Sequence, residues 1–485
     1  MRKILLYAII LFMAHVYSCS KSPSGNPRIT RQELRSTVEY LASHELHGRL
    51  AGSPGYNMAA QHLAETFKRY RLQNAGFEGY FQRFSLEYNR IQDSHFRIIT
   101  PDSIRKYRLG TDYICRGFSG SGNVKAPVVF CGYGISRPEM GYDDFEGMDA
   151  EGKIVVEFKR DPQWRLNGEG IGYRSLRKKV KAARDHGAQA IIFVSLPNVR
   201  NPQKPIGSVM HGQGSQDEDF PQIHISLETA RHLFRNSGHT LSELQTMIDK
   251  NQSPSSVELS ARAHIQVQAA YDPHKPSMNV VGMVEGDSLK DEYVVVGAHL
   301  DHVGGQAGKV YFPGANDNAS GVAALMEMAQ ALALREEKPT RSVFFVAFSA
   351  EEQGLNGSRY FVDHPPVAME KIHAMINLDC VGHGDSIVVG GGKSSPRLYQ
   401  IVKQKDDAMK QMMTSRTWAG GGADATPFYQ KGIPTLYFAT KNSYTHLHLP
   451  GDKPETLNYD LHEYLTRLAF KTTLEIAMAK NGADK

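Results

Sequence analysis

Apolar residues along this chain recur with two different periods, and the change of period divides the sequence. Near the start of the folded part, Leu34, Val38 and Leu41 follow at helical spacing behind Thr30-x-x-Glu33, a pattern typical of a capped helix N-terminus. From about residue 261 onward, continuous apolar runs alternate with helical patterns. The runs predict buried strands at 293–298, 343–348, 374–378 and 435–439. Such alternation predicts an α/β sheet.

Further helices and strands are predicted on both sides of this pattern. Residues 56–70 are expected to form a second helix, and 80–86 and 95–100 to form strands. A helix beginning near Ser320 would bury its Met and Leu stripe in the core, with Glu327 and Gln330 facing solvent.

The stretch from 107 to 254 has a different texture. Short β-type runs at 127–130 and 153–158 are separated by loops rich in Gly, Asp and Pro. One basic helix at 175–186 has Val180 and Ala183 at core spacing, and its cations are expected to form a solvated face: Arg177, Lys178, Lys179, Lys181 and Arg184. We predict an inserted β-rich domain over 107–254, within a main domain formed by 28–106 and 255–485.

The N-terminus is typical of an export signal. Basic residues precede a mostly apolar run over 4–16, which is shorter than the roughly 20 residues needed to span a bilayer. The run ends in a small residue followed by Cys19, which resembles a bacterial lipoprotein box. We predict a signal peptide over 1–18, a lipid on Cys19, a polar tether over 19–27 and a place in the bacterial cell envelope. Ordinary cleavage near Ser18 is the alternative.

Charge and cysteine content exclude several classes of protein. The chain has 56 Lys and Arg against 51 Asp and Glu, a net charge of +5, and loss of Arg2 and Lys3 would leave +3. This near-neutral balance gives no support to nucleic-acid binding. The body of the chain holds three cysteines and no CxxC, so neither a disulfide framework nor a cysteine zinc site is indicated. Cys115 and Cys131 could pair, but free buried thiols are the expectation.

Metal-type side chains follow the predicted strands of the C-terminal half. They are His299, Asp301, Asp317, Glu351, Glu352, Asp379, His446 and His448. In an open α/β sheet, ligands bind beyond the carboxyl ends of the strands, so these side chains are expected to converge. His and carboxylate ligands without cysteine suit a catalytic zinc site with open positions. The set is also large enough for two metals that share a carboxylate, with a further carboxylate left as a base.

These residues resemble the co-catalytic di-zinc exopeptidases, a family that includes bacterial leucyl aminopeptidases, aminopeptidase Y and glutamate carboxypeptidase. The resemblance covers the whole mature chain, and segment 128–156 resembles the protease-associated domain of some members. Its most specific motifs are GAHLDHVG (297–304), GANDNASG (314–321), FSAEEQGLNGSRYF (348–361), NLDCVG (377–382) and GGADATPFYQKGIP (421–434).

The resemblance implies a fold, two Zn2+ per chain and a ligand set. The implied fold is a mixed, mostly parallel sheet sandwiched by helices, with the inserted domain. Asp317 would bridge both zincs, His299 and Asp379 would complete one site, and Glu352 and His448 the other.

The resemblance also implies two catalytic roles. Glu351 would be the general base for a metal-bridged hydroxide, and Asp301 would orient His299. The expected function is zinc-dependent removal of N-terminal residues from peptides, with the insert as a lid.

The sequence departs from the family pattern near the last ligand. A Tyr usually precedes the last His and can help to hold the oxyanion, but this chain has Leu447, and Tyr444 is a candidate substitute. The choice of His448 over His446 rests on matching H-x-P-x-D to residues 448–452.

A second departure is Ala425, where a His or Tyr often follows Asp424. Asp424 is a candidate for shaping the substrate pocket, with a structural role as the alternative. We predict four histidines as non-ligands, namely His302, His364, His373 and His383.

Several other functions stay open at this point. HExxH and G-x-S-x-G are absent, so zincin and α/β-hydrolase chemistry have no support. The alternatives within the fold are a carboxypeptidase or dipeptidase, a single-zinc transferase resembling glutaminyl cyclase, and a receptor-like binding protein without catalysis. Peptides are the expected partners, with membrane contact only through the lipid on Cys19, and the sequence indicates no oligomeric state.

Overall fold

A computed structural model describes residues 29–76, 78–166, 168–173, 175–212, 214–441 and 445–480. The predicted signal peptide, lipid-bearing Cys19 and tether lie outside the described residues, as does Tyr444. Across those described ranges, no helix is both long and apolar enough to cross a membrane.

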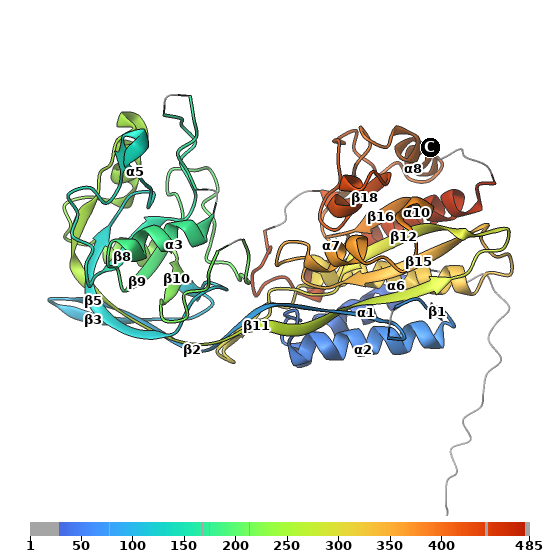
Figure 1. Cartoon of the computed structure of the whole chain (residues 1–485), viewed down its shortest axis with the longest axis horizontal. Helices are drawn as coiled ribbons and strands as arrows, with labels where there is room; N and C mark the ends of the chain where they lie inside the picture. The colour runs from blue at the N-terminus through green and yellow to red at the C-terminus, as the bar shows by residue number, and fades with distance from the viewer. Residues whose placement is uncertain are drawn as a thin grey trace, which may run out of the picture.

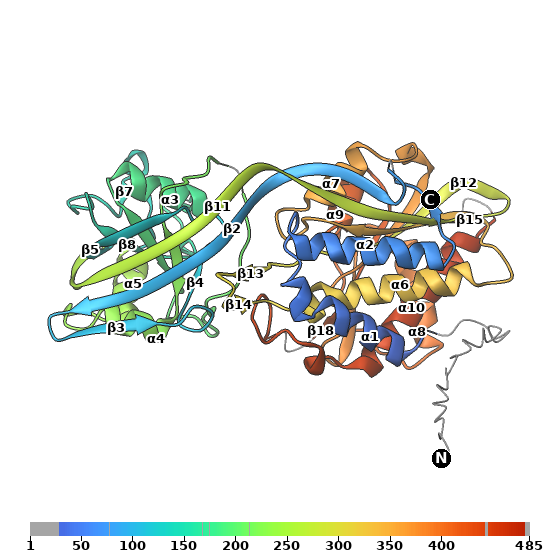
Figure 2. The same cartoon turned by 90° about the horizontal axis from the view of Figure 1, so that it is seen from below.

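Two lobes share one continuous sheet of 14 strands (Figures 1 and 2). Two long strands, β2 (Phe81–Thr100) and β11 (Val257–Val284), pair antiparallel and run from one lobe into the other. β11 pairs with β15 (Arg341–Phe348) in the C-terminal lobe and with β5 (Gly122–Phe130) in the other lobe. The strands predicted at 80–86 and 95–100 are therefore parts of one strand.

The sheet of the C-terminal lobe confirms the expected mixed α/β class. Its order is β17-β18-β16-β12-β15-β11, and the pairs from β18 to β15 are parallel. The four predicted strands are all present, and the remaining bounds are β12 (Leu289–His299), β16 (Ile372–Leu378), β17 (Ser386–Gly390) and β18 (Thr435–Lys441).

Helices cover both faces of this sheet, which explains why its strands are apolar throughout. In β12, Val294, Val296 and Ala298 pack on one face, and Val295 packs on the other. The first face carries α1 (Arg31–Leu41), α2 (Pro54–Arg69), α6 (Ser320–Ala333), α8 (Pro396–Asp407) and α10 (Tyr459–Met478). The second face carries α7 (Asn356–Asp363) and α9 (Ala425–Gln430).

The start of α1 is joined to α6 by the carboxylate of Glu327, a residue predicted to face solvent. The Thr30 hydroxyl accepts the Glu33 backbone N–H, as expected of the cap. The Thr30 backbone N–H, however, donates to Glu327 Oε2 at 3.3 Å. Glu327 is only 3% exposed, so the prediction that it faces solvent is wrong, because α1 packs over that side of α6.

The second lobe is built on a mainly parallel run of the same sheet. Its order from β11 is β5-β8-β9-β10-β4, and its core also includes Ile91 and Phe96 of β2 and Ala263 and Ile265 of β11. The remaining bounds are β4 (Tyr113–Cys115), β8 (Ile154–Phe158), β9 (Ala190–Val194), β10 (Gln222–Ile225), α3 (Leu176–Asp185), α4 (Leu227–Leu233) and α5 (Leu241–Asn251).

Short strands complete the two lobes. They are β1 (Gln73–Asn74), β3 (Ser103–Tyr107), β6 (Ser136–Arg137), β7 (Tyr142–Asp143), β13 (Gly305–Gln306) and β14 (Val310–Tyr311). The three body cysteines are free thiols, as expected.

The basic helix α3 does not present a fully solvated face. Lys179 is fully buried, and its ammonium donates to the carbonyls of Tyr133 and Phe158 and forms an ion pair with Asp161 at 3.1 Å. Arg177 is also buried. The expectation was wrong for Lys179 because buried backbone carbonyls around it need a donor. It was wrong for Arg177 because its guanidinium donates to the Gly214 carbonyl and pairs with the Glu87 carboxylate at 3.0 Å.

Candidate metal centre

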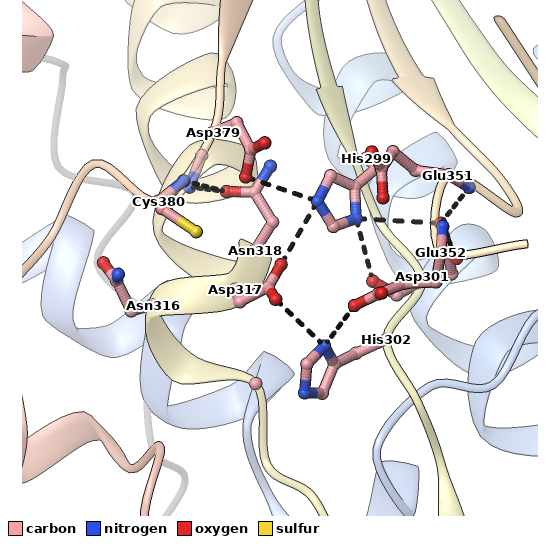
Figure 3. Close-up of polar contacts among 12 residues, drawn as sticks. His299, Asp301, His302, Asn316, Asp317, Asn318, Glu351, Glu352, Asp379 and Cys380 are labelled. Carbon is pink, nitrogen blue, oxygen red and sulfur yellow. Dashed lines mark hydrogen bonds and ion pairs between the residues drawn. The ribbon is translucent and has the colours of Figure 1, made fainter. Parts of the chain in front are cut away.

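Three adjacent parallel strands deliver their following residues to one edge of the sheet. β12 lies between β16 and β15, and it ends at His299. Glu351 and Glu352 follow the end of β15, and Asp379 directly follows β16. The loop before α6 adds Asp317 to the same place (Figure 3).

One group of potential ligands consists of His299, Asp317 and Asp379, all buried. His299 Nε2 lies 3.3 Å from Asp317 Oδ1 and 3.4 Å from Asp379 Oδ1. Asp379 Oδ1 is buried and has no hydrogen bond within the described residues, so it has a free lone pair for a cation.

A second group consists of His302, Asp317, Glu352 and His448. His448 Nε2 lies 3.2 Å from Asp317 Oδ2 and 3.0 Å from Glu352 Oε2. Asp317 belongs to both groups and turns a different oxygen to each, which is the arrangement that a bridging carboxylate requires.

These distances fit tetrahedral zinc. Nitrogen and oxygen ligands at about 2.0–2.1 Å from a tetrahedral zinc lie about 3.3 Å from one another. The charge of the site also favours metal binding, because carboxylates that lie close together away from solvent need cations to neutralise them. Burial alone would lower the pKa of His448, but the neighbouring Glu352 and Asp317 carboxylates raise it to about 11.

Glu351 lies beside the two groups but belongs to neither. Burial, together with the nearby Glu352, Asp424 and Asp379 carboxylates, raises the pKa of Glu351 well above its ordinary value. The pKa of Glu352 is instead about 2, since its contacts with His448 and His302 outweigh burial. These two adjacent carboxylates are therefore suited to different tasks, proton exchange and metal binding.

Asp301 acts on different atoms from those expected. The distance from its carboxylate to His299 Nδ1 is 3.8 Å, and Nδ1 lies 3.1 Å from the Asp301 backbone carbonyl instead. The carboxylate accepts the backbone N–H groups of Glu351 and Glu352 at 3.1 and 3.3 Å. Asp301 therefore orients His299 through its main chain and the two glutamates through its side chain.

Polar contacts also fix the loop that carries Asp317. Asp452 accepts the backbone N–H groups of Asn316 and Asp317 at 2.8 and 3.1 Å. Asn318 Oδ1 accepts the N–H of Cys380, next to Asp379. The loop is thereby joined both to the strand end of β16 and to the last loop of the site.

Arg49 also holds the ligand loops in place. Its buried guanidinium donates to the carbonyls of Leu300, Pro313 and Gly314 at 2.8–3.0 Å, and also to Leu41. It thereby ties α1 to the loops that carry the ligands.

The last loop presents His448 to the centre, whereas His446 stands beside His383 with ring centroids 6.1 Å apart. Leu447 is 43% exposed. Tyr437, which is not among the residues predicted from the sequence, donates its hydroxyl to Asp379 Oδ2 at 3.0 Å. The available signal was its position in a strand whose carboxyl end faces the site.

The other sequence candidates lie around the centre. Asp424 is fully buried at the start of α9, and burial raises its pKa to about 7. His364 and His373 belong to neither ligand group, and neither does His383. His302, predicted as a non-ligand, belongs to the second group.

A segment of the other lobe reaches the centre. The Gly207 N–H donates to the His448 carbonyl at 2.8 Å. Val209 packs in one apolar cluster with Val303 and Phe312, which flank the ligand loops. The segment 205–212, called the wall segment below, therefore lies beside the second ligand group.

The chain is similar in sequence to known peptidases. A sequence model described as Peptidase family M28 matches residues 279–473. Aminopeptidase YwaD of Bacillus subtilis is 25% identical over 441 residues, which cover 88% of this chain and 79% of that protein. A glutamate carboxypeptidase 2 homolog of Caenorhabditis elegans is 26% identical over 71% of this chain, which spans about half (52%) of that relative.

Solved structures share the fold. A zinc aminopeptidase from Bacillus subtilis superposes with a TM-score of 0.66 at 21% identity, covering 95% of this chain and 98% of that one. An aminopeptidase from Aneurinibacillus sp. strain AM-1 gives a TM-score of 0.63 at 20% identity, with 94% and 95% covered. The likeness includes both lobes.

Proposed function

The chain carries a peptidase family M28 domain over residues 279–473, and from this premise we propose that it is a zinc-dependent aminopeptidase with two metal ions per chain. One observation carries the proposal, namely that two groups of potential metal ligands share Asp317 through its two oxygens. The choice of an aminopeptidase over a carboxypeptidase is supported by relatives that are named aminopeptidases.

Each ligand group has a defined place in this proposal. His299, Asp317 and Asp379 would hold one zinc, and Asp317, Glu352 and His448 would hold the other. When bound, the two zincs would supply the Lewis acidity that activates water and polarises the scissile carbonyl.

Glu351 moves the proton. Its carboxylate is buried beside both groups without being part of either, and its raised pKa suits a group that takes a proton from water and passes it to the leaving amine. Asp301 holds the Glu351 backbone in place for this transfer.

Metal content and cleavage specificity test the proposal together. Purified protein is analysed for zinc and assayed on peptides with free and with acetylated N-termini. Two zincs with cleavage confined to free amines are expected. Cleavage that ignores the amine but needs a free carboxylate would favour the carboxypeptidase alternative, which the glutamate carboxypeptidase relatives suggest. A single zinc would contradict the shared-ligand assignment.

We further propose that the second lobe is a protease-associated domain that limits access to the centre. The support is the wall segment, because Gly207 bonds to the main chain of His448 and Val209 packs against the flanks of the ligand loops. Because this contact lies beside the second ligand group, we expect it to restrict the size of a substrate.

The N-terminal pattern supports a third proposal, attachment to the bacterial cell envelope through a lipid on Cys19. Membrane fractions from cells that express the full chain are expected to retain the protein, and Cys19→Ala to release it. Equal retention of both proteins would contradict the lipid anchor.

A further inference from the structure

His302 is buried in the second ligand group, and its role follows from which oxygen of Glu352 it contacts. Its Nδ1 lies 2.8 Å from Glu352 Oε1, while His448 faces Oε2 at 3.0 Å. The two histidines therefore divide the two oxygens of one carboxylate between them (Figure 3 shows His302 pointing into the cluster).

The distances separate a hydrogen bond from shared metal ligation. The histidine nitrogens and carboxylate oxygens that would share a zinc lie 3.0–3.4 Å apart. Two ligands of a tetrahedral zinc are expected to lie about 3.3 Å apart. The 2.8 Å contact is shorter and typical of an N–H donor to a carboxylate. His302 Nδ1 also lies 3.8 Å from Asp317 Oδ2, farther than the other ligand pairs.

The first ligand group is built in the same way. Asp379 turns Oδ1 to His299 at 3.4 Å, and its other oxygen accepts the Tyr437 hydroxyl at 3.0 Å. The two carboxylates that belong to a single group, Glu352 and Asp379, are thus arranged alike. Each turns one oxygen to its ligand group, and its other oxygen accepts a hydrogen bond from an aromatic side chain, His302 or Tyr437.

The His302 ring has little freedom to move. Its backbone N–H donates to the Arg49 carbonyl, and its ring stands edge-on to His448 with centroids 5.3 Å apart. A Cβ on Gly314, whose φ is +62°, would lie 2.6 Å from the ring, so only glycine leaves room for it. This packing fixes the direction of the Nδ1–H bond.

We propose that His302 is a positioning residue that holds Glu352 as a one-oxygen metal ligand by donating Nδ1–H to Oε1. The inference rests on the proposed metal centre. Without the donor, Glu352 is free to rotate or to bind through both oxygens, and the second metal is held less tightly.

The test measures binding of cobalt(II) to the metal-free protein by competition with a chelator. His302→Ala is expected to raise the dissociation constant of the more affected ion by about 10–100-fold. His302→Asn places an amide N–H near the position of Nδ1 and should restore binding close to that of wild type. His302→Gln places its amide beyond that position and should behave like His302→Ala.

Two matched variants control for other causes. Tyr437→Phe removes the corresponding hydrogen-bond donor to Asp379 and should also weaken the binding of one cobalt ion. His224→Ala removes a fully buried histidine of the second lobe and should leave cobalt binding unchanged. Thermal unfolding of each metal-free variant shows whether it is folded.

Three results would overturn the inference or its basis. Wild-type affinities in His302→Ala would show that the contact has no positioning role. Loss of binding in His302→Asn equal to that in His302→Ala, with a changed visible cobalt spectrum, would make His302 a direct ligand. Fewer than two cobalt ions in the wild type would instead contradict the proposed function itself.

Discussion

At the scale of single residues, the centre separates neighbouring side chains into different tasks. Glu351 and Glu352 follow one strand, yet the pKa of Glu351 is raised and that of Glu352 is about 2. The difference arises because Glu352 contacts His448 and His302, whereas Glu351 is surrounded by other carboxylates. Environment, not residue type, thus assigns the base and the ligand.

Replacing the base should remove activity without removing metal. Glu351→Gln is expected to lower kcat by about 10²–10⁴-fold, because an amide does not take up the proton. Initial rates on a free-amine peptide and zinc analysis check this. Glu370→Gln, at an exposed site, is the matched control. A fully active Glu351→Gln enzyme would contradict the assignment.

Replacing the shared carboxylate should affect both metals. Asp317→Ala is expected to lose both zincs, whereas Asp379→Ala and His448→Ala, each in one group only, should each retain one zinc more tightly than the other. Elemental analysis after dialysis measures the content. If Asp317→Ala kept two zincs, Asp317 would not be the bridge.

At the scale of elements, α1 and α6 are joined by a buried glutamate. Glu327 accepts the Thr30 N–H, and burial, aided by the charge of Glu33, raises the pKa of Glu327 to about 8. Its carboxyl is therefore protonated in the folded protein over a range in which the unfolded chain is ionised.

This shift predicts a pH dependence of stability. The raised pKa stabilises the fold fully below about pH 4.5, and the contribution is lost as pH rises through 8. Glu327→Gln stays neutral and should gain on the order of a few kcal/mol relative to wild type at pH 8.5, but not at pH 4.5. Urea unfolding at both pH values measures this.

An exposed glutamate gives the control for that experiment. Glu336→Gln lies just beyond α6 at the surface, and its effect on stability should not depend on pH in this way. Equal stability of Glu327→Gln and wild type at pH 8.5 would contradict the predicted shift.

At the scale of the whole molecule, β2 and β11 make the lobes parts of one sheet and bring the wall segment to the metal centre. Val209 is buried against Val303 and Phe312. Replacing Val209 by a smaller, polar residue should weaken this packing by about 1–2 kcal/mol and should leave the metal ligands unchanged.

Weaker packing of the wall segment should change which substrates reach the metal centre. Val209→Ser is expected to raise kcat/KM for long peptides relative to a dipeptide substrate, with both zincs retained. Val199→Ser, at an exposed position of the same lobe, is the matched control. A proportional change for short and long peptides would show that the wall segment does not select by length.

The α/β class, the parallel central strands and the types of residue at their ends could all be predicted from the amino-acid sequence. This was possible because burial on both faces forces continuous apolar runs, and because parallel strands end at one edge. His299 and Asp379 were therefore predictable as neighbours from the strands that precede them.

Which side chains share a buried space could not be predicted in this way, because it depends on contacts between distant segments. Glu327 and Lys179 look like surface residues in the sequence and are buried, since helix α1 and neighbouring strand ends supply their partners. His302 and Tyr437 likewise acquire a role only through contacts between distant segments, with Glu352 and Asp379 respectively. Periodicity records which face of an element is apolar, whereas hydrogen-bond partners depend on how the elements pack.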